Sequence, residues 1–193
     1  MSLPLPSSLS PSKISTFKDC ALAFRFSAID KLPEPPSAPA VKGSLVHRAL
    51  ELLFVAKPHE RSREFGDVCL DTAVGEFATN DEFVGLDLDD AAAAAFVDDA
   101  RRMLGRYFDL EDPTSFDPVG VELMLAVEVG DLLLRGIIDR LDLDADGELV
   151  VTDYKTGRVP SEQQEMARLG GVHFYALLCE HVFGKRPKKV QLM

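Results

Sequence analysis

The chain has 193 residues, of which 46% are apolar and 27% charged, and its formal net charge is −11. This is the composition of an ordinary globular protein, and at this length one domain can bury roughly 70% of the surface of its unfolded chain. A disulfide-stapled mini-protein, a disordered tail and a fibrous repeat are thereby excluded. Because the sequence holds neither an apolar run near the ~20 residues of a membrane span nor a signal-peptide pattern, we expect a cytoplasmic protein without a membrane partner.

The charge is unevenly distributed along the chain. Residues 1–63 carry nine Lys and Arg against five Asp and Glu, although the whole sequence is acidic. The acidic balance argues against a general nucleic-acid coat protein, but it leaves room for a basic edge. We expect the basic residues within 185–189 to be a solvated strand start. The cysteines form no CxxC pair, which indicates reduced thiols at Cys20, Cys69 and Cys179.

Helices are expected over most of the first 112 residues. Apolar residues recur at helical spacing after Ser12, which is the expected N-cap of the first helix. The proline-rich residues 33–39 predict an extended loop, followed by a second helix that starts near Gly43. Residues 64–112 predict a helical insertion, and its stretch 81–99 holds seven acidic residues and no basic one.

The apolar period changes to two after Pro118, which predicts strands. Residues 121–129, 132–143 and 148–155 predict a three-stranded antiparallel meander. A helix over 161–183 and a crossover strand in the final KKVQLM complete the pattern. The fold class is therefore α/β or α+β, with a mixed central sheet flanked by helices in one domain over 1–193. Since the last strand coincides with the end of the sequence, we expect a C-terminally truncated domain.

The residues that point to a chemical function lie in the hairpin GIIDRLDLDADGELVVTDYKTG, residues 136–157. If Gly147 takes the left-handed position of a three-residue loop, Asp144 lies opposite Glu148, and counting back places Asp139 opposite Asp153. Lys155 projects from the same strand face as Asp153. Two carboxylates in apolar surroundings are costly unless a cation lies between them. The pattern favours a Mg²⁺ or Mn²⁺ site with a lysine that stabilises charge on a phosphoryl oxygen.

These residues resemble a known family. The GxxDRxD pattern that contains Asp139, followed by Asp153, Lys155 and Thr156-Gly157, is similar to the RecB-like branch of the PD-(D/E)XK nucleases, as in AddB and RecB nuclease domains and CRISPR-associated RecB-like nucleases. Gly43 and His47 resemble the branch's GxxxH helix motif. The resemblance implies a restriction-endonuclease-like core. It also implies a metal-dependent DNA exonuclease of repair or recombination that acts on single strands or DNA ends, alongside a helicase or other repair proteins.

The same resemblance implies the site residues. Asp139, Asp153 and Lys155 correspond to the catalytic set, and His47 with the two aspartates to the metal ligands. Further candidates come from the strand before the hairpin and from the last helix: Glu122, Gln163, Gln164 and Tyr175. The two glutamines are candidates because Gly171 stands where relatives often carry a glutamine.

Some relatives also bind an iron–sulfur cluster. They use a cysteine followed by proline near the N-terminus and three C-terminal cysteines. Here Cys20 is followed by Ala21, and no such trio follows before Met193. Cys20 is therefore a candidate cluster ligand only in a longer chain.

Several alternatives fit the same residues. Asp139, Asp153 and Lys155 could be the solvated face of amphipathic strands, and His47 could form a surface pair with Glu51. The chain could also be a catalytically inactive nuclease fold that acts as a DNA-binding or scaffold subunit. Residues 142–153 partly match a calcium-binding loop, although such a loop needs flanking helices.

Overall fold

The computed structural model describes residues 6–157 and 162–193, and of residues 162–170 the backbone alone. The described chain divides into two compact units. The sheet unit takes the described parts of 1–34, 122–153 and 159–192, and the helical unit takes those of 35–121, 154–158 and 193. The chain therefore passes from one unit to the other several times.

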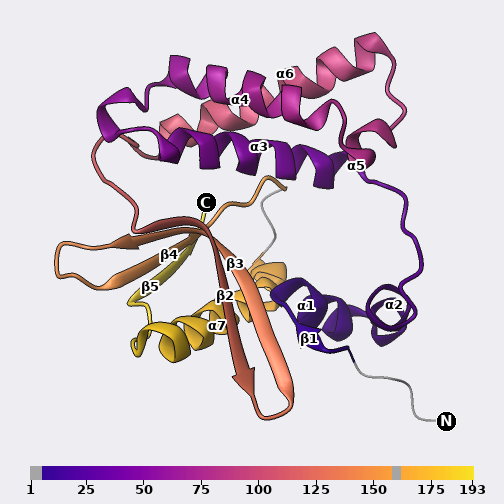
Figure 1. Cartoon of the computed structure of the whole chain (residues 1–193), viewed down its shortest axis with the longest axis vertical. Coiled ribbons are helices and arrows are strands. Elements are labelled where there is room, and N and C mark those ends of the chain that lie inside the picture. Colours follow the sequence, from indigo (N-terminus) through magenta and orange to yellow (C-terminus); the bar gives the residue numbers. More distant parts are fainter. Residues whose placement is uncertain (1–5, 158–161) are drawn as a thin grey trace. The chain divides into compact units, whose positions relative to one another are not determined.

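The described strands of the sheet unit form one mixed five-stranded sheet in the order β1-β3-β4-β5, with β2 also paired to β3 (Figure 1). Its strands are β1 (Ser8–Leu9), β2 (Gly120–Val129), β3 (Leu132–Leu143), β4 (Leu149–Asp153) and β5 (Lys189–Leu192). The predicted mixed sheet and its meander are thereby confirmed, but β4 ends at Asp153, so Lys155 lies beyond the strand expected over 148–155. β5 runs parallel to β4, and α7 (Glu162–Phe183) precedes it in the chain, as the crossover prediction requires. The short strand β1, parallel to β3, was not predicted.

The N-terminal helical region is more broken than the sequence suggested. It consists of α1 (Pro11–Asp19), α2 (Ala21–Phe24) and a π-helical turn η1 (Arg25–Ile29). The predicted N-cap at Ser12 is wrong, because the Ser10 side chain accepts the cap hydrogen bond from Lys13. Cys20 takes an extended conformation and ends α1, and its sulfur accepts from the backbone N–H of Ala23 at 3.5 Å. One continuous helix is therefore interrupted at Cys20.

The helical unit contains α3 (Ala38–Val55), a 3₁₀ turn η2 (Pro58–Glu60), α4 (Arg63–Phe77), α5 (Asp81–Val84) and α6 (Asp90–Leu110). The expected start of α3 near Gly43 was several residues late. The helix begins at Ala38 with Ser37 as its N-cap, because proline is tolerated in the first turn of a helix, where its missing N–H would have no helical partner.

Both units have their own apolar core. In α6, four buried residues recur at helical spacing, and the Asp89 side chain caps the first turn: Phe96, Ala100, Leu104 and Tyr107. The larger fully buried apolar side chains of the helical unit include Leu45, Leu53, Leu70 and Leu104; those of the sheet unit include Ile138, Leu141, Val151 and Leu178. Figure 1 shows α3, α4 and α6 packed along one another.

One buried cation organises the end of α3 in the helical unit. The Arg61 side chain is 2% exposed, and its guanidinium lies 5.2 Å from the centroid of the Phe54 ring. Its N–H groups donate to the carbonyls of Phe54, Ala56, Pro113 and Phe116 and to the carboxylate of Asp117. The guanidinium of Arg61 thus connects the end of α3 with the loop of residues 113–117.

Candidate active site

The register of β3 and β4 places two acidic residues at the same position of the sheet. Arg140 pairs with Thr152 and Leu141 with Val151, so one further step brings Asp139 opposite Asp153. Gly147 has φ of +75°, and the N–H of Asp144 donates to the Glu148 carbonyl at 2.9 Å. The hairpin geometry expected from the sequence is therefore confirmed. Asp139 and Asp153 are buried, and directly opposed side chains lie on one face of a sheet.

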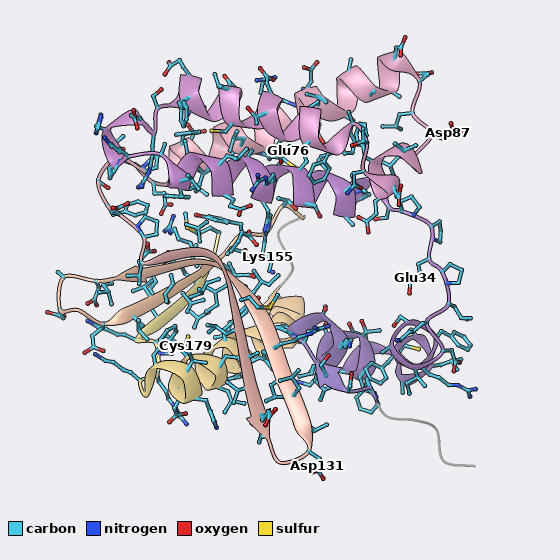
Figure 2. All side chains as sticks on the ribbon, in the orientation of Figure 1. Glu34, Glu76, Asp87, Asp131, Lys155 and Cys179 are labelled. Atoms are coloured by element: carbon cyan, nitrogen blue, oxygen red, sulfur yellow. The ribbon has the colours of Figure 1, made fainter. Side chains whose placement is uncertain are left out.

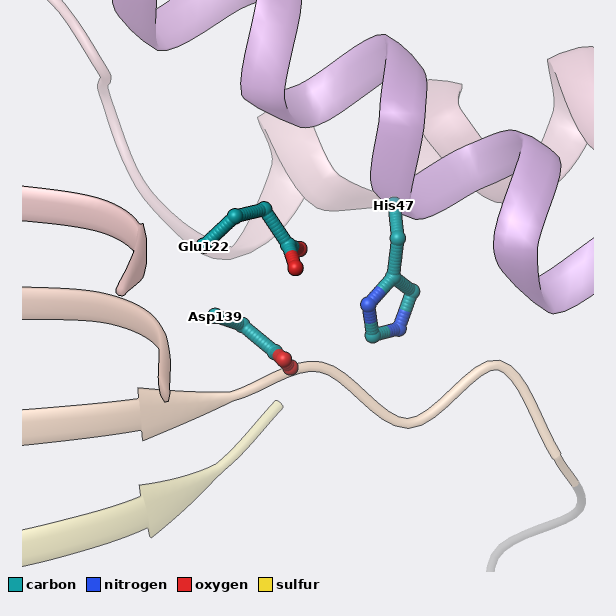
Figure 3. Close-up of side chains that lie close together, drawn as sticks. All are labelled: His47, Glu122 and Asp139. Atoms are coloured by element: carbon teal, nitrogen blue, oxygen red, sulfur yellow. The ribbon is translucent and has the colours of Figure 1, made fainter. Parts of the chain in front are cut away.

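Glu122 adds a third carboxylate to this part of the sheet unit. One carboxylate oxygen of Glu122 lies within 4.8 Å of one of Asp139, and Figure 3 shows the two side chains next to each other. Glu122 also has φ of +47°, a left-handed conformation that costs a non-glycine residue roughly 1–2 kcal/mol. The sequence placed Glu122 on the polar face of a regular strand. The structure shows a strained position in the neighbourhood of Asp139.

Tyr175 of α7 reaches the same carboxylates. Its hydroxyl donates to Oδ1 of Asp153 at 3.4 Å. Burial raises the pKa of Tyr175, and the charges of Asp153, Asp139 and Glu122 raise it further. α7 comes close to β3 at Gly136, where an added Cβ would lie 3.2 Å from Leu178. Gly136, the glycine of the GxxDRxD pattern, therefore lets α7, which carries Tyr175, pack closely against β3.

His47 lies on α3 in the helical unit (Figure 3). Its Nε2 lies 3.1 Å from the carbonyl oxygen of Tyr154. A carbonyl oxygen only accepts hydrogen bonds, so Nε2 carries a proton in this contact. Glu51, the partner expected in a surface pair, forms an ion pair with Arg48 at 2.7 Å. With Nε2 bonded to the Tyr154 carbonyl, Nδ1 is the ring nitrogen through which a neutral His47 would bind a metal.

Gly43 explains the other half of the GxxxH motif. A Cβ at this position would lie 2.8 Å from Oγ1 of Thr156. Tyr154 is buried in the helical core and stacks edge-on against the His47 ring at a centroid distance of 6.1 Å. One face of α3 is thus fitted to the segment 154–156 through Gly43 and His47, one turn apart.

The remaining candidates are placed as follows. Lys155 is exposed and labelled in Figure 2, and its backbone N–H donates to the carbonyl of Met193 at 2.6 Å. The side chains of Gln163 and Gln164 lie outside the described part of the chain. Cys20 is exposed, with the helix-capping contact given above. The roles expected for these residues stay predictions.

The calcium-loop alternative is contradicted by the hairpin. Residues 142–153 run from β3 into β4 and have strands on both sides where a calcium-binding loop of this kind needs helices. The ammonium of Lys188 lies 2.9 Å from the carboxylates of Asp144 and Asp146, and its hydrogen bond is the main cause that lowers the pKa of Asp144. Asp144 and Asp146 therefore form ion pairs with Lys188 at the tip of the hairpin.

The basic residues within 185–189 are exposed and lie at the start of β5, as expected. Lys185 pairs with Glu148 at 2.8 Å, and Arg186 pairs with Glu180 at 2.7 Å. With Lys188 also paired, much of this positive charge is neutralised by neighbouring acids. The solvated strand start is thus confirmed, and the structure adds its ion pairs.

The donor set of the sheet unit fits a hard divalent cation. Carboxylate oxygens are the ligands that Mg²⁺ and Mn²⁺ prefer, and one or two carboxylates with several waters suffice for Mg²⁺. Glu122 and Asp139 bring such oxygens within 4.8 Å, in a region that also holds Asp153. A bound cation would offset the repulsion between these like charges.

Sequence reasoning missed two polar residues next to the aspartates. Thr152 and Gln191 meet through their side chains at 2.8 Å. Arg140 of the GxxDRxD pattern donates to Asp142 at 2.9 Å and to Thr152 at 3.4 Å. The pairing of Thr152 with Gln191 could not be found without the register between β4 and β5.

Comparison with known proteins agrees with this geometry. None of the curated proteins matches the chain. The family model of the PD-(D/E)XK nuclease superfamily matches residues 8–192, which span both units. The mixed sheet flanked by helices is that of the restriction-endonuclease-like core, and the carboxylates are consistent with metal binding. The chain therefore belongs to the PD-(D/E)XK nuclease superfamily.

Proposed function

We propose that the protein is a Mg²⁺- or Mn²⁺-dependent deoxyribonuclease that hydrolyses phosphodiester bonds. Membership of the superfamily supports a metal-dependent nuclease. The observation that carries the proposal is the gathering of Glu122, Asp139 and Asp153 in the sheet unit. An inactive scaffold has no need to keep three mutually repelling carboxylates in one region.

The residues divide into metal ligands and charge stabilisers. Asp139 and Asp153 bind the ion, and Glu122 is a further donor. When bound, the divalent ion supplies Lewis-acid polarisation of the phosphate and lowers the pKa of a coordinated water. Lys155 orients the attacking water and offsets negative charge as it develops on the phosphoryl oxygens. Hydrolysis forms a new bond from the water oxygen to phosphorus and breaks a P–O bond, whose oxygen leaves with a proton.

His47 belongs to the same site in this proposal. It contacts the carbonyl of Tyr154, which is joined by a peptide bond to Asp153. The residue that His47 contacts is therefore the direct chain neighbour of a proposed metal ligand. The carbonyl contact orients the ring with Nε2 as donor, as is usual for metal-binding histidines, so Nδ1 is the nitrogen that would face the metal when the ring is neutral.

The finer assignment rests on the motifs. The GxxDRxD pattern and the following Asp153-x-Lys155 support the RecB-like branch, and with it an exonuclease of DNA repair or recombination that acts on single strands or ends. A helicase or another repair protein is the partner that this assignment implies, in the cytoplasm. None of the described helices is long and apolar enough to cross a membrane. Gln163, Gln164 and Tyr175 are proposed to position the substrate or the lysine.

The experiment is DNA cleavage by the purified chain with Mg²⁺, with Mn²⁺ and with EDTA. Asp139→Asn and Lys155→Ala should each lower the rate at least about a hundredfold, as expected for charge-stabilising groups. Asp144→Asn is the matched control, since Asp144 pairs with Lys188 at the hairpin tip and should leave the rate unchanged. Cleavage that persists in EDTA, or equal rates for the Asp139 and Asp144 variants, would refute the proposal.

A further inference from the structure

A row of polar side chains crosses three strands of the sheet unit. Arg140 of β3 is paired in register with Thr152 of β4, and Thr152 is paired with Gln191 of β5. Their side chains are also connected, because an Arg140 N–H donates to Thr152 Oγ1 at 3.4 Å and the Gln191 amide donates to the same oxygen at 2.8 Å. A hydroxyl oxygen has two lone pairs, so it can accept both bonds.

This row lies one residue away from the candidate metal ligands. Arg140 follows Asp139, and Thr152 precedes Asp153. Since side chains alternate along a strand, the row and the two aspartates project from opposite faces of the same strand pair. Any shift of β3 against β4 that breaks the Arg140–Thr152 contact therefore also moves Asp139 relative to Asp153.

The aspartates need such a constraint. Two buried carboxylates repel each other, and β4 ends at Asp153, where its pairing with β3 is easiest to open. Thr152 is fully buried, and Arg140 is 2% exposed and ion-paired with Asp142 at 2.9 Å. A charged hydrogen bond in such surroundings is stronger than its counterpart at the surface.

We propose that Arg140, Thr152 and Gln191 are positioning residues that set the spacing of Asp139 and Asp153 through the Thr152 hydroxyl. The inference rests on the proposed function, because it assigns these residues to the metal site of the nuclease. It predicts that loss of one buried hydroxyl weakens metal binding although no ligand is altered.

The test is titration of the purified chain with Mn²⁺, followed by the electron paramagnetic resonance signal of the unbound ion, well below the melting temperature. Thr152→Val keeps the shape of the side chain and removes the hydroxyl, and we expect Mn²⁺ affinity to fall about tenfold, as for other groups that orient metal ligands. Thr152→Ser restores the hydroxyl and should bind Mn²⁺ within about twofold of the wild type. Gln191→Met should lie between the two.

Thr114→Val is the matched control, because its hydroxyl bonds Asp112 in a turn of the helical unit. It should leave Mn²⁺ affinity unchanged. A Thr152→Val variant with wild-type affinity and a lower melting temperature would overturn the inference and leave the proposed function standing. A wild-type chain that binds no Mn²⁺ would overturn the proposed function and the inference together.

Discussion

Both units bury charge, but they do so in different ways. In the helical unit, Arg61 is surrounded by backbone carbonyls and the carboxylate of Asp117. In the sheet unit, Asp139 lies opposite Asp153, and the carboxylate of Glu122 lies near that of Asp139. All three of these side chains are acidic. The neighbours of the arginine are acceptors that stabilise its charge, whereas the carboxylates repel one another, although the Tyr175 hydroxyl donates to Asp153.

This difference separates a structural charge from a functional one. A buried cation with good hydrogen-bond partners fixes loops and is costly to remove, because its acceptors are then left in the interior. Like charges held together destabilise the fold until a ligand of opposite charge binds. Neutralising one charge should therefore have opposite effects on stability in the two units.

The largest expected effect is that of Asp153→Asn. The rate of DNA cleavage should fall about a thousandfold, which corresponds to about 4 kcal/mol, because a ligand and a charge are lost. In the absence of metal, the melting temperature should rise, since a repulsive charge is removed. Calorimetry in EDTA measures this rise. A fall in melting temperature would show that the charge of Asp153, like that of Arg61, stabilises the fold.

The next effect is that of Arg61→Leu, which removes the cation and leaves its acceptors buried. The free energy of unfolding should drop by about 3 kcal/mol. Urea unfolding gives the value, and reaction of Cys69 with a thiol reagent during mild denaturation shows which unit opens. Arg63→Leu is a suitable control, because Arg63 is half exposed in its pair with Asp109. Equal losses for both arginines would contradict the structural role of Arg61.

Gly43→Ala should cost about 2 kcal/mol of stability, because the new methyl group would overlap Oγ1 of Thr156. Adding Thr156→Ala removes that oxygen and should restore most of the loss. The double-mutant cycle therefore measures the contact between α3 and the segment after β4. Additive losses would show that the two residues do not meet.

A smaller effect is expected for His47→Ala. Imidazole nitrogen suits Mn²⁺ better than Mg²⁺, so the Mn²⁺-supported rate should fall about tenfold more than the Mg²⁺-supported rate. Parallel rate measurements in the two metals give this ratio. Glu51→Ala is the control for the ion pair with Arg48 and should leave the ratio unchanged. Equal losses in both metals would exclude His47 as a selective ligand.

The smallest effect concerns the thiols. Burial raises the pKa of Cys69 and of Cys179, which is labelled in Figure 2, to about 11, while Cys20 is exposed. At pH 8 a thiol reagent should label Cys20 quickly and the other two only after unfolding. Because the folded state holds these protons more tightly, their contribution to stability is present at neutral pH and is lost as the pH rises from about 9 to 11. Mass spectrometry of the labelled chain checks the order.

Much of the sheet could be predicted because its period and its turn are local features. The left-handed Gly147 fixes the hairpin loop, and the loop fixes which residues face each other, so the Asp139–Asp153 pair followed by counting. The strand β1 was missed because two residues carry too little periodicity. The interruption at Cys20 was missed because a cysteine is an uncommon helix cap.

The site was predicted less completely than the sheet. Glu122 has a positive φ inside a segment whose alternating pattern predicts ordinary extended backbone, so the local pattern did not reveal the strain. The ion pairs of Lys188 with Asp144 and Asp146 join residues more than forty positions apart, so the sequence showed only a basic run and an acidic loop. Contacts between distant segments are the part that composition and spacing leave undetermined.

The short segment 154–157 has a consequence for how such proteins evolve and are engineered. It is flanked in the chain by parts of the sheet unit but packs with the helical unit through Tyr154 and Thr156. A transplant of residues 35–121 into a related scaffold would therefore arrive without the segment to which α3 is fitted. Among homologues, residues 43 and 156 should covary in size, and recombination breakpoints should avoid separating α3 from the segment that carries Lys155.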